Sequence, residues 1–283
     1  MANRQMERIA YIETYAKDKG YGDNSILYAL IRCLPARDAL ELLRRCYKDN
    51  PVLRDATLYV LDDLKGPGRE EALEQLVEAI IQEFPELPAN RRSSTFLCLG
   101  VLLKKVSDVT ADRIMKFLLD SKYAAGRRKG LKLLQPEEII RYGAYIERCA
   151  WEHREHVAVM RLITHYPAQY VHNRRQDFAR ILDAQWSLAR LYLRAAEHDR
   201  NCVAELREID GITYAYVKAK LEEPLSFAEA QQLIEQNHLD ERLGLLSWAF
   251  GKMGLWDALV LIAEHAGEWQ MERMQQVMAR YDV

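Results

Sequence analysis

Glycine and proline are scarce in this sequence, with 13 Gly and 8 Pro among 283 residues. A strand-rich fold needs many such turn residues, whereas helices joined by short turns need few. Long apolar runs are absent too, and the longest, such as residues 258–263, is far shorter than a membrane span. The composition therefore favours an all-α fold and predicts no association with a membrane.

The cysteines are few, odd in number and widely scattered, and no pair has C-x-x-C spacing: Cys33, Cys46, Cys98, Cys149 and Cys202. Neither a zinc site nor a disulfide framework is indicated. We expect buried free thiols in a reducing compartment. The first residues also lack an apolar signal core, so we predict a cytoplasmic protein.

Motifs for catalysis are missing as well. There is no Gly-rich phosphate loop and no G-x-S-x-G elbow, and no cysteine lies convincingly beside a histidine. His153 and His156 are three residues apart on a predicted helix and so share a face, but no third metal ligand has suitable spacing. We therefore expect no catalytic residues, no metal and no cofactor.

Helical periodicity is what the sequence does contain, most clearly around residues 49–61. Asn50 can cap a helix, and Pro51 fits the first helical position, where no N–H is needed. Leu53 and Val60 follow at helical spacing, so we expect both to be buried. Another apolar stripe lies just upstream, in a helix that starts after Pro35. Two helices so close in sequence must pack antiparallel.

The same helix pair recurs along the chain. Arg54, Arg91 and Arg128 lie 37 residues apart, near the starts of predicted second helices. Beyond residue 164 we expect one long helix over 174–198 and another over 212–221. The remaining predicted pairs are 72–81 with a helix from 89, 114–119 with 123–134, and 136–149 with 151–164.

The pattern Asp49, Asn50, Pro51, Arg54, Ala56 and Leu61 resembles the second helix of a HEAT repeat. Residues 121–134, 239–242 and 268–273 are looser matches, and the stretch near 170–223 fits least. The resemblance implies a right-handed α-α superhelix of antiparallel helix pairs with a concave binding surface. We expect residues 1–283 to form a single repeat domain of this kind.

Charge is polarised along the chain although the net charge is −2. Residues 84–135 hold eleven basic and four acidic residues, a balance of +7, and residues 193–241 hold five and eleven, a balance of −6. The first window supplies five candidate partner-binding residues: Arg91, Arg92, Arg127, Arg128 and Lys129. They could form a cationic row that binds an acidic partner. Alternatively, one arginine per repeat pairs with an acid of the neighbouring turn, and the other is solvated.

Tryptophans offer two further interpretations. Trp186 with Asp183 and Arg190 resembles the site of alkylpurine DNA glycosylases, which are built from HEAT-like repeats, but we favour a core tryptophan beside an ordinary charge pair. The last forty residues hold Trp248, Phe250, Trp256 and Trp269, which predict either core filling at the end of the repeats or a docking patch.

Together these features favour a non-enzymatic module that binds an acidic protein partner on a concave helical surface. One alternative is a nucleic-acid-binding protein that resembles the DNA glycosylases and uses Trp186, Asp183 and Arg190. Another is an immunity-type inhibitor that neutralises a toxin. The near-zero net charge argues against a dedicated nucleic-acid binder.

Overall fold

A computed structural model describes residues 2–19, 24–182, 184–237 and 242–265, together with residues 271–272, 275–276 and 279. Over these residues the chain forms 18 α-helices and three short 3-10 helices, with no strand, which confirms the all-α prediction. No helix in this part of the chain has both the length and the apolar character needed to cross a bilayer.

The chain divides into two compact units, Met1–Val157 (unit 1) and Ala158–Val283 (unit 2). The expected single repeat domain over residues 1–283 stays a prediction.

Unit 1 is a succession of helix pairs, each with a first and a second helix. The first helices are α1 (Ala2–Lys19), α3 (Ala36–Cys46), α5 (Arg69–Glu83), α7 (Asp108–Leu119) and α9 (Gly143–Trp151). The second helices are α2 (Ser25–Arg32), α4 (Pro51–Tyr59), α6 (Ala89–Leu102) and α8 (Ala124–Leu133). Two 3-10 turns, η1 (Phe84–Glu86) and η2 (Pro136–Glu138), follow α5 and α8.

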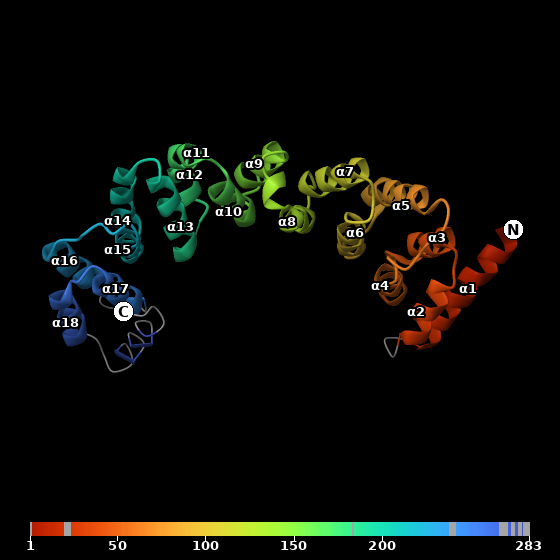
Figure 1. Ribbon diagram of the computed structural model, residues 1–283, viewed down its shortest axis with the longest axis horizontal. Coiled ribbons are helices and arrows are strands. Elements are labelled where there is room, and N and C mark those ends of the chain that lie inside the picture. Colours follow the sequence, from red (N-terminus) through yellow and green to blue (C-terminus); the bar gives the residue numbers. More distant parts are fainter. Residues whose placement is uncertain are drawn as a thin grey trace. The chain divides into compact units, whose positions relative to one another are not determined.

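Each first helix of unit 1 contacts the next first helix, and each second helix contacts the next second helix. The two members of a pair, such as α3 with α4 or α7 with α8, also contact each other. In Figure 1, α3, α5 and α7 accordingly lie on one side of unit 1, and α4, α6 and α8 lie on the other. Unit 1 is therefore a two-layered stack of helix pairs.

Local signals explain the start of α4. The side chain of Asn50 accepts a hydrogen bond from the backbone N–H of Leu53 at 3.1 Å, and Pro51 occupies the first turn. Leu53 is 1% exposed and Val60 is fully buried, which confirms both predictions.

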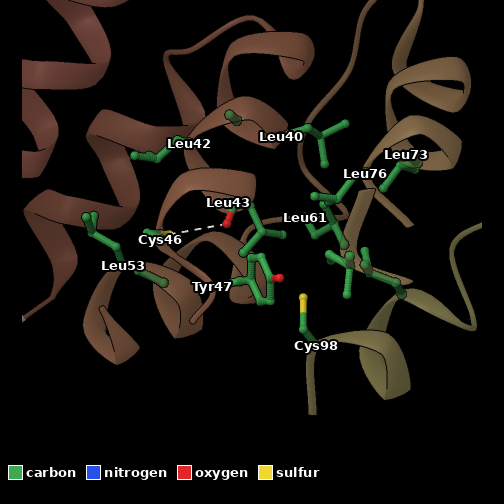
Figure 2. Close-up of a cluster of buried hydrophobic side chains, with 14 of the residues drawn as sticks. Leu40, Leu42, Leu43, Cys46, Tyr47, Leu53, Leu61, Leu73, Leu76 and Cys98 are labelled. Atoms are coloured by element: carbon green, nitrogen blue, oxygen red, sulfur yellow. Dashed lines mark hydrogen bonds between the residues drawn. The ribbon is translucent and has the colours of Figure 1, made fainter. Parts of the chain in front are cut away.

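The core of unit 1 lies between its two layers. In Figure 2, Leu43 of α3 and Tyr47, the residue after α3, lie between Leu53 of α4 and Leu73 and Leu76 of α5. All five side chains are almost completely buried. Because each pair buries its apolar faces against the next pair, the stack is stabilised by contacts between neighbours.

Unit 2 begins within α10 (His156–His165) and repeats the pattern less regularly. Its other second helices, α13 (Gln185–Ala196), α15 (Gly211–Lys220) and α17 (Leu243–Lys252), contact one another in that order. The other elements of unit 2 pack beside them: α11 (Ala168–Asn173), α12 (Arg175–Ala179), η3 (Arg200–Glu205), α14 (Leu206–Ile209), α16 (Phe227–Asn237) and α18 (Trp256–His265). We call these the first-layer elements of unit 2.

The long helix expected over residues 174–198 is wrong, because the chain forms α12 and α13 instead, with a break between them. A continuous helix of that length would extend about 37 Å. The break allows α12 to pack against α13, and it buries Phe178 and Leu182. Ala184 has an extended backbone and starts the new helix.

The pair expected over 136–149 and 151–164 is also shifted. Residues 136–138 form η2, closed by a hydrogen bond from the backbone N–H of Gln135 to the carboxylate of Glu138 at 2.9 Å. The α-helix begins only at Gly143 and continues through Trp151, so α10 starts five residues later than expected.

Candidate binding surface

An arginine occupies the fourth position of three consecutive second helices in unit 1: Arg54 in α4, Arg92 in α6 and Arg127 in α8. The structural spacing is therefore 38 and then 35 residues, and the constant 37-residue spacing of Arg54, Arg91 and Arg128 does not mark equivalent positions. The position within the helix, rather than the distance along the chain, defines the repeat.

Each of these arginines reaches toward the next second helix. Arg54 donates from Nη1 to the hydroxyl of Ser94 in α6 at 2.8 Å, and from Nε to the carboxylate of the adjacent Asp55, also at 2.8 Å. The guanidinium of Arg92 lies 4.2 Å from the ring centroid of Tyr123, the residue before α8. We infer that these buried or half-buried arginines join successive pairs.

Arg127 completes the series. It donates from Nη2 to the carboxylate of Glu155 at 2.9 Å and from Nη1 to the carbonyl of Ser121 at 2.9 Å. Glu155 lies directly before α10 and is 5% exposed, and Arg127 is 6% exposed. A buried carboxylate thus neutralises a buried guanidinium, as charges inside a protein require.

The five candidate partner-binding residues therefore do not form one open positive surface. Arg127 is buried, which corrects its assignment to that surface. Arg91 pairs with Asp49 at 2.8 Å, and Arg128 shares Glu155 with Arg127 at 3.0 Å. Arg92 packs on Tyr123, and Lys129 crosses over Gly100. The first half of the alternative, an arginine paired with an acid of a neighbouring turn, describes Arg91 and Arg127. The second half does not hold, because Arg128 also pairs with Glu155 and Arg92 packs on Tyr123.

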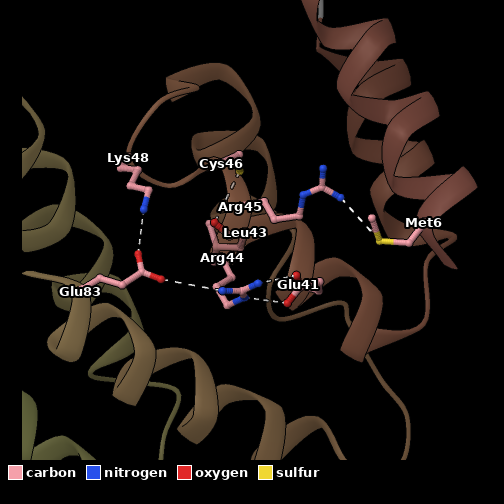
Figure 3. A network of polar contacts seen from close by, with 8 residues as sticks. All are labelled: Met6, Glu41, Leu43, Arg44, Arg45, Cys46, Lys48 and Glu83. Carbon is pink, nitrogen blue, oxygen red and sulfur yellow. Dashed lines mark hydrogen bonds and ion pairs between the residues drawn. The ribbon is translucent and has the colours of Figure 1, made fainter. Parts of the chain in front are cut away.

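Basic residues at or just after the end of α3 pair with carboxylates of α3 and α5. In Figure 3, the carboxylate of Glu83 in α5 receives Lys48 at 2.9 Å and Arg44 at 3.8 Å, and Arg44 also pairs with Glu41. Burial raises the pKa of Glu83, but the hydrogen bonds from Lys48 and Tyr47 and the charge of Arg44 outweigh burial and lower it overall. This network is a contact between neighbouring pairs, and its cations are already occupied.

The second helices have a different charge pattern. Among the eight described second helices, α2, α4, α6, α8, α10, α13, α15 and α17, Asp55 is the single Asp or Glu. Every first helix of unit 1 carries at least one acid. In unit 2, all first-layer elements except α11 do so as well. Acidic side chains are therefore segregated into one layer.

The second helices of unit 2, which contain no Asp or Glu, also carry aromatic residues. Three of its second helices carry an aromatic residue followed, four residues later, by a basic one: Trp186 and Arg190 in α13, Tyr216 and Lys220 in α15, and Trp248 and Lys252 in α17. Residues four apart share one face of a helix. We call these six residues the aromatic–basic ladder.

The aromatic rings of the ladder touch across the three helices. Trp186 meets Tyr216 edge-on, with centroids 5.4 Å apart, and Tyr216 packs on Trp248 at 5.1 Å. The ammonium of Lys220 lies 5.7 Å from the Tyr216 centroid and 5.0 Å from that of Trp248. Contacts in this range attract the cation to the ring face. They hold the Lys220 amine over the rings.

The basic members of the ladder are open to solvent. Arg190, Lys220 and Lys252 are exposed, and none forms an ion pair with a residue that the structure describes. Arg161 of α10 is half-buried and likewise forms no ion pair with a described residue. Burial, followed by the charges of Arg161 and Arg190, lowers the pKa of His165.

The expectation that Trp186 is a core residue is wrong, and the C-terminal aromatic residues differ in their burial. Trp186 is 54% exposed, so it is not a core residue, and its proposed acidic neighbour Asp183 lies outside the described residues. Trp248 and Phe250 are buried, whereas Trp256 is 63% exposed. Trp269 falls among residues that the structure does not describe, and so do most residues of the looser repeat matches at 239–242 and 268–273.

The described histidines and buried cysteines do not gather into a metal site. His153 lies in the turn before α10, so it does not share a helix face with His156, and no metal-binding group of three ligands is present among these residues. Burial raises the pKa of the Cys98 thiol to about 12 and that of Cys149 to about 11. Such thiols stay protonated at neutral pH and are inert as nucleophiles.

The segregation of charge between helix layers is not visible in a continuous window of the sequence. A window along the chain mixes first and second helices, so it averages the acid-rich layer with the acid-free one. The usable signal was the aromatic residue followed by a basic one at 186/190, 216/220 and 248/252. Comparisons with known protein families, with curated proteins and with solved structures gave no match.

Proposed function

We propose that this chain is a non-enzymatic, HEAT-like binding protein of the cytoplasm that takes an acidic protein partner on its second helices. The observation that carries the proposal is the near-complete lack of Asp and Glu in those helices. A right-handed superhelix would place the second helices along its concave side, where cations from successive pairs face one ligand.

The spacing of the free cations favours a protein over a nucleic acid. Neighbouring packed helices are about 8–10 Å apart, so one exposed cation per helix gives a sparse row of charges. Duplex DNA carries one phosphate charge per about 1.7 Å of its axis and is bound by far denser basic surfaces. Carboxylates spaced along a polypeptide match a sparse row better.

Binding of a labelled poly-glutamate chain to the full-length protein tests this proposal. Lys132 is an exposed lysine of α8 that forms no ion pair with a described residue. We expect Arg190→Glu and Lys132→Glu to slow association, because rim charges steer encounter. Arg180→Glu is the matched control, since Arg180 is an exposed arginine that follows α12 in the first layer of unit 2 and pairs with Asp177.

Two results would contradict the proposal. In the first, poly-glutamate does not bind, or Arg180→Glu slows its association as much as Arg190→Glu does. In the second, duplex DNA binds more tightly than poly-glutamate, with log K falling linearly against log salt. The second result would support the nucleic-acid alternative.

A further inference from the structure

The aromatic–basic ladder carries one basic residue on each of three consecutive second helices, which restricts the conformation of a bound chain. Arg190, Lys220 and Lys252 come from consecutive packed helices, α13, α15 and α17. Packed helices lie about 8–10 Å apart, so basic side chains that extend from their own helices recur at about that interval along the layer. A matching ligand must present one carboxylate every 8–10 Å on a single face.

A polyproline II helix meets this requirement. It has three residues per turn and a rise of about 3.1 Å per residue, so residues three apart share a face about 9 Å apart. A flat β-strand does not, because residues three apart point to opposite faces. An α-helix would need six residues to cover the same distance at 1.5 Å each, which is not a whole number of turns.

The exposed indole of Trp186 supports the same ligand. It is 54% exposed although its edge-on contact with Tyr216 holds it in place. Proline-rich segments in the polyproline II conformation dock on aromatic side chains, and their preformed shape reduces the entropy lost on binding. The ladder thus combines an aromatic platform with cations at the interval of this helix.

We propose that the aromatic–basic ladder of unit 2 binds a polyproline II segment of a partner protein that carries an acidic residue at every third position. This inference rests on the proposed function, since it specifies the acidic partner. Arg190, Lys220 and Lys252 each take one carboxylate, and Trp186 packs against the prolines between them.

Fluorescence anisotropy with labelled peptides tests the register. The probe repeats the triplet Glu-Pro-Pro, and its control has the same composition with all glutamates adjacent. We expect the repeated triplet to bind the full-length protein more tightly. Lys220→Gln should weaken this binding about two- to fivefold, the range of exposed ion pairs, and Trp186→Ala about tenfold or more. Arg180→Gln should leave it unchanged.

Each other outcome overturns the inference in a recognisable way. If poly-glutamate binds the protein but the two proline peptides bind equally, the register is wrong and the proposed function survives. If poly-glutamate does not bind either, the proposed function has failed. If a single-stranded oligonucleotide of equal charge binds more tightly than the triplet peptide, the ladder is a nucleic-acid site. Circular dichroism of each variant separates a lost contact from a lost fold.

Discussion

The guanidinium of Arg127 lies 2.9 Å from the carboxylate of Glu155, and both side chains are more than nine-tenths buried. The two residues are 28 positions apart and belong to successive helix pairs. A buried charge without its partner is strongly destabilising, so this pair makes one repeat depend on the next.

Removal of one member of this pair should therefore be costly. We expect Glu155→Gln to lower the free energy of unfolding by about 3–5 kcal/mol, because it leaves the Arg127 guanidinium buried without a counter-ion. Asp49→Asn is the control, because the pair of Asp49 with Arg91 is exposed and should contribute about 1 kcal/mol or less. Urea denaturation would measure both, and equal losses would contradict the assignment.

The core position of Leu53 gives a second prediction. Leu53→Ala should cost about 2–4 kcal/mol through lost burial and the cavity left between α3, α4 and their neighbours. Val109, which is 76% exposed, provides a comparison, and Val109→Ala should change stability by about 0.5 kcal/mol or less. A small loss at Leu53 in chemical denaturation would show that the layer packs differently.

Alanine should change the stability of the fold differently at two buried helical glycines. At Gly126 a Cβ would lie 2.7 Å from Oγ of Ser121 and 2.8 Å from Cε1 of Phe96, both in buried residues, so Gly126→Ala should destabilise by about 1–3 kcal/mol. At Gly100 it would meet the flexible end of Lys129.

The Lys129 side chain can move aside, so Gly100→Ala should be neutral or should stabilise the fold by up to about 1 kcal/mol through helix propensity. The midpoints of thermal unfolding should therefore move apart for the two variants. A loss at Gly100 similar to that at Gly126 would mean that the Lys129 side chain is fixed.

The pair of Glu205 with Arg175 predicts a pH dependence. The hydrogen bond from Arg175 lowers the pKa of Glu205 against a smaller opposing effect of burial. The folded state therefore binds the proton less tightly than the unfolded state, and the pair stabilises the fold above the ordinary glutamate pKa of about 4.3. This stability is lost as the pH falls through the lower folded-state pKa.

Glu205→Gln should thus reduce the melting temperature at neutral pH, and the difference from the unsubstituted protein should fade below pH ~4. Glu86→Gln is the control, since Glu86 is exposed and forms no ion pair with a described residue. A difference for Glu205→Gln that persists unchanged in acid would argue for a packing effect instead of the ion pair.

Local chemistry made α4 predictable, because its cap, its proline and its apolar spacing all lie within residues 50–60. The break between α12 and α13 was not predictable in this way. Phe178, Leu182 and Trp186 follow one another at helical spacing across the break, so the apolar pattern does not mark it, whereas the structure packs α12 against α13 there. The sequence predicted helices from neighbours in the chain and missed what depends on neighbours in space.

The candidate surface shows the same division. Arginine pairs are visible in the sequence, but the burial of Arg127 depends on Glu155, which lies 28 residues later. The ladder of Trp186, Tyr216 and Trp248 likewise needs three helices to be placed side by side before its interval has any meaning.

The forward reach of Arg127 gives the chain a direction during synthesis. A ribosome makes α8 well before Glu155, and domains fold as their segments emerge, N-terminal parts first. Until those 28 further residues have been added, the guanidinium has no carboxylate and must stay hydrated, so α8 cannot close onto α7 as tightly as in the finished protein. Each helix pair in this part of the chain is completed by the one translated after it.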